Sequence, residues 1–134
     1  MKNKKLNIVL WIAQSYLALF MIGLGIFKLI TPIAVLSLKF PWTGMVPEAL
    51  LVAICFIDIS GGLGILFPSL LRIKPHLTLY AAIGIILLMS SAIIMHIFLG
   101  EFILVPLNLI IIAIAGFVYW GRSKRAVIFP KTIG

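Results

Sequence analysis

The chain has 134 residues, of which 63% are hydrophobic and 10% are charged, and its formal net charge is +8. Soluble domains carry about 25% charged residues, and a chain of this length could not bury so much apolar surface, so a soluble globular protein is excluded. The mean hydropathy of +1.28 instead indicates an integral membrane protein, for which we expect a single domain over residues 1–134.

The first predicted element is a transmembrane helix over residues 6–30, which follows a short basic leader. A signal peptide also begins with basic residues, but its apolar core is only about 7–15 residues long and a small-residue cleavage site follows it. The apolar segment here is far longer, and no such site is apparent. We therefore expect residues 6–30 to span the bilayer.

Residues 31–47 contain three prolines and Gly44, and are too broken for a spanning helix. Phe40, Trp42 and Met45 lie within this connection. Because tryptophan favours headgroup depth, we expect the connection to lie in the membrane interface.

Three further spans are predicted over residues 48–67, 76–99 and 102–120, each close to the roughly 20 residues that cross the hydrocarbon core. Pro68 is expected to end the first of these, because proline interrupts helical hydrogen bonding. The predicted fold class is all-α, an integral membrane four-helix bundle.

Lys and Arg concentrate on the cytoplasmic side of membrane proteins, and their distribution predicts the orientation. Nine of them fall in the leader, in the connection before the third span and in a basic tail over residues 121–134: Lys2, Lys4, Lys5, Arg72, Lys74, Arg122, Lys124, Arg125 and Lys131. The opposite side holds Lys39, with Lys28 near it. Both termini are therefore expected in the cytoplasm, and the same pattern argues against a nucleic-acid partner.

Each predicted helix has one face of small and polar residues, and its other faces are mainly Leu, Ile, Val and Phe. Residues spaced by three, four or seven share a helix face. In helix order the four sets are Gln14, Ala18, Met21, Gly25 and Lys28; Glu48, Leu51, Cys55, Asp58 and Gly62; Ala82, Ile85, Met89, Ala92 and His96; and Glu101, Asn108 and Ala115. A bundle of four such helices can hide its polar groups from lipid.

Asp58 lies near the middle of its span and is the main candidate for a functional residue. A charge at the bilayer centre costs about 2.5–3.5 kcal/mol on insertion scales, and the default interpretation is a functional group that faces the bundle interior. Lys28 is expected about nine residues, or ~13 Å, nearer the outer end of the bundle. A direct pair between Lys28 and Asp58 would need strong tilt or a helix shift, so it is not expected.

The expected ligand-binding residues are Lys28, Asp58, His96, Asn108, Gln14 and Glu101. They predict a polar pocket that opens to the outer side, with Asp58 at its floor. Asp58 and His96 are the candidate catalytic residues, because a carboxyl group and an imidazole can exchange protons. The open alternative is that Lys28, Glu48 and Glu101 only extend to the headgroups. His96 would then be a hydrogen-bonded residue of a helix end.

Metal and disulfide chemistry find little support in the sequence. His76 and His96 are expected on opposite sides of the membrane and cannot share a site. A ligand set of His96 with Glu101 or Glu48 has unspecific spacing, so no metal site is predicted. The only cysteine, Cys55, lies inside an apolar run and is expected to be a small packing residue.

Three elements match a family pattern in order along the chain. Residues 25–28 form a G-x-x-K element, residues 58–68 place Gly, Leu and Pro after an acidic residue, and residues 92–101 form A-x-x-x-H followed by Gly-Glu. Together they resemble the DoxX-like family of small bacterial four-helix membrane proteins. That family usually has Glu at the position of Asp58, so the carboxylate here has a reach shorter by one methylene.

The resemblance implies a multi-pass protein of the bacterial cytoplasmic membrane. Relatives in this family include the small subunits of a thiosulfate:quinone oxidoreductase, and others are linked to redox stress. The resemblance thus implies a quinone-linked redox component, with quinone as the candidate cofactor. The alternative is a non-enzymatic binder of a lipophilic small molecule or lipid, or an assembly subunit with membrane partners or with its own copies. The sequence leaves open whether the chain is an enzyme.

Overall fold

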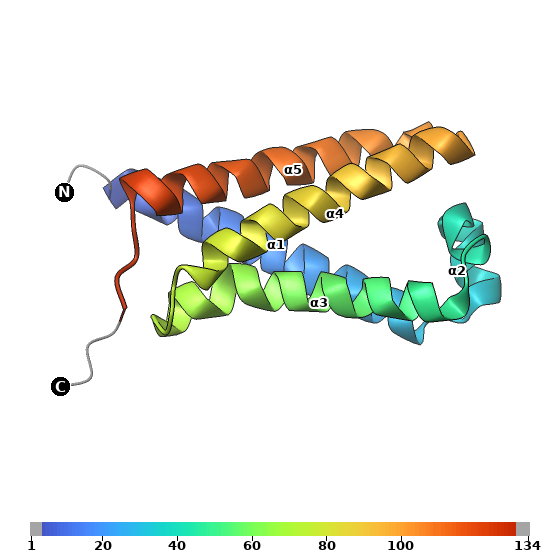
Figure 1. The fold of residues 1–134 in the computed structure, drawn as a ribbon, viewed down its shortest axis with the longest axis horizontal. Coiled ribbons are helices and arrows are strands. Elements are labelled where there is room, and N and C mark those ends of the chain that lie inside the picture. The colour runs from blue at the N-terminus through green and yellow to red at the C-terminus, as the bar shows by residue number, and fades with distance from the viewer. Residues whose placement is uncertain (1–3, 131–134) are drawn as a thin grey trace.

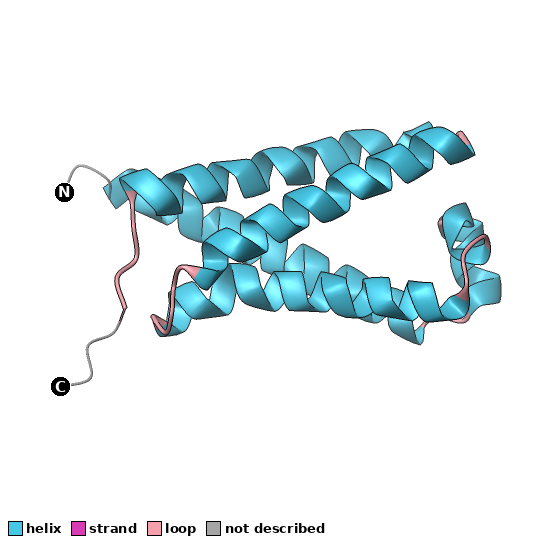
Figure 2. Cartoon of the chain, in the orientation of Figure 1, coloured by secondary structure: helices cyan, strands magenta, loops and turns pink. Residues whose placement is uncertain are grey.

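The computed structural model describes residues 4–130, and these residues form helices with no strand (Figure 2). In chain order the elements are α1 (Lys4–Ile30), α2 (Ile33–Lys39), a 3-10 turn η1 (Pro41–Gly44), α3 (Glu48–Leu71), α4 (Leu77–Leu99), a 3-10 turn η2 (Phe102–Leu104), α5 (Val105–Trp120) and a π-helical turn η3 (Gly121–Arg125). Two basic residues used to predict the orientation, Lys2 and Lys131, lie outside the described residues.

Four helices are long and apolar enough to cross a membrane: α1, α3, α4 and the continuous run Phe102–Arg125. α1 packs along α3 and α4 packs along α5, while α3 and α4 also touch. In Figure 1 these two pairs converge at the end that holds the α3–α4 connection and diverge at the end where α2 lies. The protein is therefore a multi-pass membrane protein, and its bundle is wider at one end.

The predicted polar faces lie in the interior of the bundle with one exception: Glu48, which was expected on the face of Asp58, is exposed. Gln14, Lys28, Asp58, His96 and Asn108 are all buried, and each lies among the buried apolar residues of its own helix. Large apolar side chains cover the outer faces, as is required of helices that contact lipid.

Two glycines allow α1 and α3 to approach closely. A Cβ atom built on Gly25 would lie 2.9 Å from the carbonyl oxygen of Cys55, and one built on Gly62 would lie 3.0 Å from the carbonyl oxygen of Ala18. Any larger residue would therefore press on the backbone of the facing helix. These contacts fix the register of α1 against α3 and set the height at which Lys28 meets that helix.

We expect Gly62→Ala to lower the stability of the protein by about 1–3 kcal/mol, because its methyl group would overpack this contact. Gly84→Ala is the matched control: it gives the same gain in helix propensity, and its Cβ would have nothing within 4 Å. Thermal unfolding in detergent measures both. A Gly62→Ala variant as stable as Gly84→Ala would show that the contact is not tight.

Two expectations about the connections need correction. α3 does not end at Phe67: it passes through Pro68 to Leu71. A proline removes one backbone hydrogen bond, and packed membrane-spanning helices tolerate that loss. The basic tail does not begin at residue 121, since η3 continues the last span and buries Arg122. Trp42 of the connection is packed against the bundle, with 6% of its area exposed.

Candidate functional site

Lys28 and Asp58 form a buried ion pair, in which Nζ of Lys28 lies 2.7 Å from Oδ2 of Asp58. The expectation that these residues lie too far apart for direct pairing is therefore wrong. The expected offset between Lys28 and Asp58 assumed that α1 ends at the membrane depth at which α3 begins. The glycine contact instead places Gly25 directly beside Cys55 and Asp58. Lys28 is only one turn beyond Gly25. Because side chains lean toward the N-terminus of their own helix, those of two antiparallel helices lean toward each other here.

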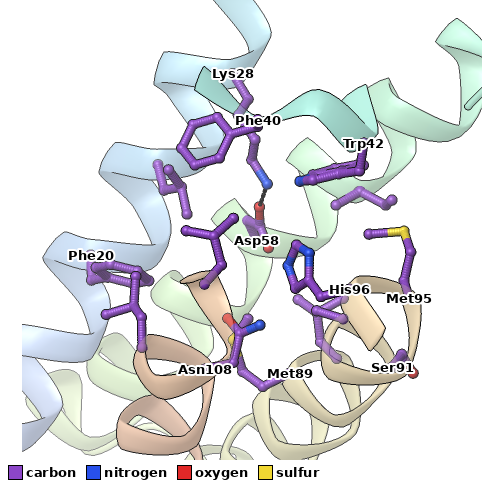
Figure 3. Close-up of a pocket in the computed structure, with 16 residues that line it drawn as sticks. Phe20, Lys28, Phe40, Trp42, Asp58, Met89, Ser91, Met95, His96 and Asn108 are labelled. Carbon is purple, nitrogen blue, oxygen red and sulfur yellow. Dashed lines mark ion pairs between the residues drawn. The ribbon is translucent and has the colours of Figure 1, made fainter. Parts of the chain in front are cut away.

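The ion pair borders a cavity of about 160 Å³ between the two helix pairs. Residues of α1, α3, α4 and α5 line it, together with side chains of the connection after α2. Four of the six predicted ligand-binding residues lie on its wall, namely Lys28, Asp58, His96 and Asn108. Figure 3 shows Asp58, His96 and Asn108 around one common space, most of whose remaining wall is apolar.

The connection between α1 and α3 closes one side of this cavity. Trp42 of η1 lies over the ion pair, with Nζ of Lys28 5.3 Å from the centroid of a Trp42 ring, and Phe40 lines the wall beside it (Figure 3). A cation held against an aromatic face is stabilised by the ring quadrupole. The sequence interpretation missed Trp42 as a wall residue, because an aromatic residue after a proline at a helix end also fits a headgroup anchor.

Glu101 contacts His96 and does not line the cavity. Nδ1 of His96 lies 3.3 Å from Oε1 of Glu101, and both side chains are largely buried. Gly100 ends α4 in a left-handed conformation (φ 74°), which turns the chain so that the Glu101 N–H donates to the carbonyl oxygen of His96 at 2.8 Å. A carboxylate at Nδ1 favours the proton on that nitrogen, which leaves Nε2 as the acceptor.

The Asn108 side chain supplies a hydrogen-bond donor to the cavity. Asn108 is 8% exposed, and its Nδ2 has no hydrogen-bond partner among the residues that the structure describes. Buried amides are normally paired, so an unpaired one on a cavity wall calls for an explanation. A hydrogen-bond acceptor bound in the cavity would satisfy it.

Gln14 lies elsewhere, at the narrow end of the bundle. Its Nε2 donates to the carbonyl oxygen of Ile65 at 2.7 Å, and its Oε1 accepts from Nε of Arg122 at 2.6 Å. Sequence reasoning assigned Arg122 to the tail and missed this contact. The sequence contained the signal: Arg122 follows Ala115 by seven residues, as Ala115 follows Asn108, so the three residues share one helix face.

A comparison with known protein families matches residues 12–118 to the DoxX-like family. The same comparisons found no curated protein and no solved structure that matches the chain significantly. The family match spans most of the chain and includes the four predicted ligand-binding residues that lie on the cavity wall. The chain therefore belongs to the DoxX-like family.

Proposed function

We propose that this protein binds a quinone in the cavity and serves as a quinone-linked redox component of the bacterial cytoplasmic membrane. The observation that carries the proposal is the unpaired Asn108 amide, which faces the same cavity as the Lys28–Asp58 pair. Donors and proton-exchanging groups around an apolar space suit a flat, lipid-soluble ligand that carries oxygen atoms.

The size of the cavity supports a single ring as its occupant. A dry cavity of about 150 Å³ is known to accept benzene, and the cavity here measures about 160 Å³. One six-membered ring would fit between the apolar walls, and an isoprenoid tail would have to leave the bundle toward lipid.

The roles of the residues follow from their chemistry. Lys28 and Asn108 would donate hydrogen bonds to ligand oxygens, while Asp58 and His96 would hold or release the protons that accompany reduction and oxidation. Glu101 would set the tautomer of His96. A bound quinone would supply the two-electron chemistry, and we assign the exchange of electrons to a partner in the same membrane.

A single-tryptophan variant tests this proposal. Trp42 borders the cavity, whereas Trp11 lies near Arg122 at the other end and Trp120 lies near Arg125. With Trp11 and Trp120 replaced by Phe, a short-tailed benzoquinone should quench the fluorescence of Trp42 saturably. The matched control keeps Trp11 alone, and we expect no saturable quenching there.

The outcomes separate the two candidate functions. Saturable quenching at Trp42, followed by oxidation of a quinol by the purified protein with an added soluble electron acceptor that takes its two electrons, would make the chain an oxidoreductase in its own right. Quenching without turnover supports a quinone-binding subunit. Equal, non-saturable quenching in both variants would refute the quinone site and leave the alternative of a lipid-binding or assembly subunit.

The orientation belongs to the same proposal, and cysteine labelling tests it. In a Cys55→Ala background, cysteines placed at the exposed residues Met45 and Lys124 mark the two ends of the bundle. The distribution of Lys and Arg predicts that Met45→Cys reacts with an impermeant maleimide in intact cells and that Lys124→Cys reacts only after permeabilisation. Labelling of Lys124→Cys in intact cells would invert the orientation.

A further inference from the structure

The narrow end of the bundle holds a buried guanidinium, that of Arg122. Its Nε donates to Oε1 of Gln14 at 2.6 Å, and its Nη1 donates to Oδ1 of Asn7 at 2.6 Å and to the carbonyl oxygen of Ala126 at 2.9 Å. Only 4% of Arg122 is exposed. Its third nitrogen, Nη2, is buried and has no hydrogen-bond partner within residues 4–130.

None of these partners carries a negative charge. The chain has three acidic side chains, Glu48, Asp58 and Glu101. Asp58 pairs with Lys28, Glu101 contacts His96, and Glu48 begins α3 at the opposite, wider end (Figure 1). A buried cation that meets only neutral groups carries a large desolvation cost, and an unmade hydrogen bond adds to it. Within residues 4–130, no anionic group therefore contacts this guanidinium.

The local backbone brings this guanidinium to the wall of a hollow. The N–H of Ala126 donates to the carbonyl oxygen of Gly121 at 2.7 Å, which closes the π-helical turn that contains Arg122. Such turns are rare and are frequently found at functional sites. Arg122 lines a hollow of about 210 Å³ together with Ser69, His76 and Ser123.

A second arginine contacts the C-terminal segment that lines the hollow. Nε of Arg72 donates to the carbonyl oxygen of Phe129 at 3.0 Å, and Phe129 is one of four consecutive residues, 127–130, that line the hollow. Arg72 and Lys74 lie in the connection that precedes α4, so they add positive charge to this end of the bundle. Most residues that line the hollow are apolar, and Arg122 is the one Lys or Arg among them within residues 4–130. Its buried cationic donor, with the basic residues nearby, favours an anionic occupant.

We propose that this hollow binds an oxyanion of the phosphate type, with Nη2 of Arg122 as its principal donor. The planar guanidinium suits the several acceptor oxygens of a phosphate, and a hydrogen bond between two charged groups is stronger than a neutral one. The hollow lies at the end of the membrane spans, near the depth of phospholipid headgroups, so the phosphate comes either from a lipid headgroup or from solution. This site is independent of the proposed quinone site.

Trp11 provides a local reporter, because its ring centroid lies 4.8 Å from Cζ of Arg122. In a variant with Trp42 and Trp120 replaced by Phe, the fluorescence of Trp11 would be followed in detergent. The probes are inorganic phosphate, short-chain phosphatidic acid and, as a control without phosphate, the corresponding diacylglycerol. A saturable change with both phosphate probes identifies free phosphate as a sufficient ligand, and a change with phosphatidic acid alone identifies a lipid headgroup. No saturable change with either phosphate probe would overturn the proposal.

Two substitutions in the Trp11 reporter then test the role of Arg122. Arg122→Gln should weaken phosphate binding at least about tenfold, since a hydrogen bond to a charged group contributes that factor or more. The control Lys124→Gln removes the same charge from an exposed residue at the same end and should leave the affinity close to that of the parent. If phosphate affinity fell equally in both variants, the loss would come from the general surface charge, and the proposed site would be refuted.

Ser123→Asp covers the case in which Arg122→Gln does not fold. The new carboxylate would stand in the hollow beside Arg122 and replace the bound anion. We expect it to raise the unfolding temperature measured without phosphate and to abolish the Trp11 response. A Ser123→Asp variant that binds phosphate as tightly as the parent would contradict the proposed site.

Discussion

Lys28→Met is expected to destabilise the protein by about 3–5 kcal/mol, because removing one partner of a buried ion pair leaves the other charge uncompensated. The charge left behind is the carboxylate of Asp58, which is 2% exposed and lies against the glycine contact between α1 and α3. Met keeps most of the length of the lysine side chain, so the loss would come mainly from charge. Chemical or thermal unfolding in detergent measures it.

The control for this prediction is the double variant Lys28→Met/Asp58→Asn. With both charges removed, most of the stability should return, since a buried ion pair is worth little compared with neutral residues of similar volume. In a double-mutant cycle, the loss of stability in the double variant should then be smaller than the sum of the losses in the two single variants, and this difference is the coupling free energy of the pair. Losses that simply add would indicate that the two side chains act independently, which would contradict the 2.7 Å contact.

Asn108→Leu is expected to change stability and ligand binding in opposite directions. Replacing a buried amide that has an unpaired donor removes its desolvation cost, so we expect the free energy of unfolding to rise by about 1–3 kcal/mol. The same substitution removes one donor from the cavity, and the affinity for a short-tailed benzoquinone at Trp42 should fall about three- to tenfold.

Ser91→Ala serves as the control for Asn108→Leu. Ser91 also lines the cavity, but its hydroxyl donates to the carbonyl oxygen of Leu87 at 2.9 Å and is therefore already paired. Its removal should affect quinone affinity much less. An Asn108→Leu variant that loses stability and retains full affinity would show that the amide is a structural group with a partner of its own.

The sequence predicted the polar interior because helix geometry alone determines it. A spacing of three, four and seven residues identifies the side chains that share a face, and those faces had to turn away from lipid. His96 and Asn108 were therefore assigned correctly to the interior from their spacing. The same rule, extended by one more heptad, would have placed Arg122 there as well.

The contact between Lys28 and Asp58 could not be predicted in the same way. Spacing within one helix says nothing about the height of that helix against its neighbour. The glycine contacts of Gly25 and Gly62 set this height, and they depend on which backbone atoms face each glycine. The role of Trp42 was hidden for a similar reason, because it depends on how the connection after α2 folds back over the bundle.

Native mass spectrometry of the protein extracted in mild detergent tests the central claim most directly. We predict that the parent retains a stoichiometric adduct with the mass of a quinone, and that the Lys28→Met/Asp58→Asn variant, folded but without the charged pair, loses it. The helical content and the unfolding temperature of both proteins would be compared first. A parent protein that carries no quinone, or a double variant that retains the same quinone in the same proportion, would contradict the assignment of this cavity as a quinone site.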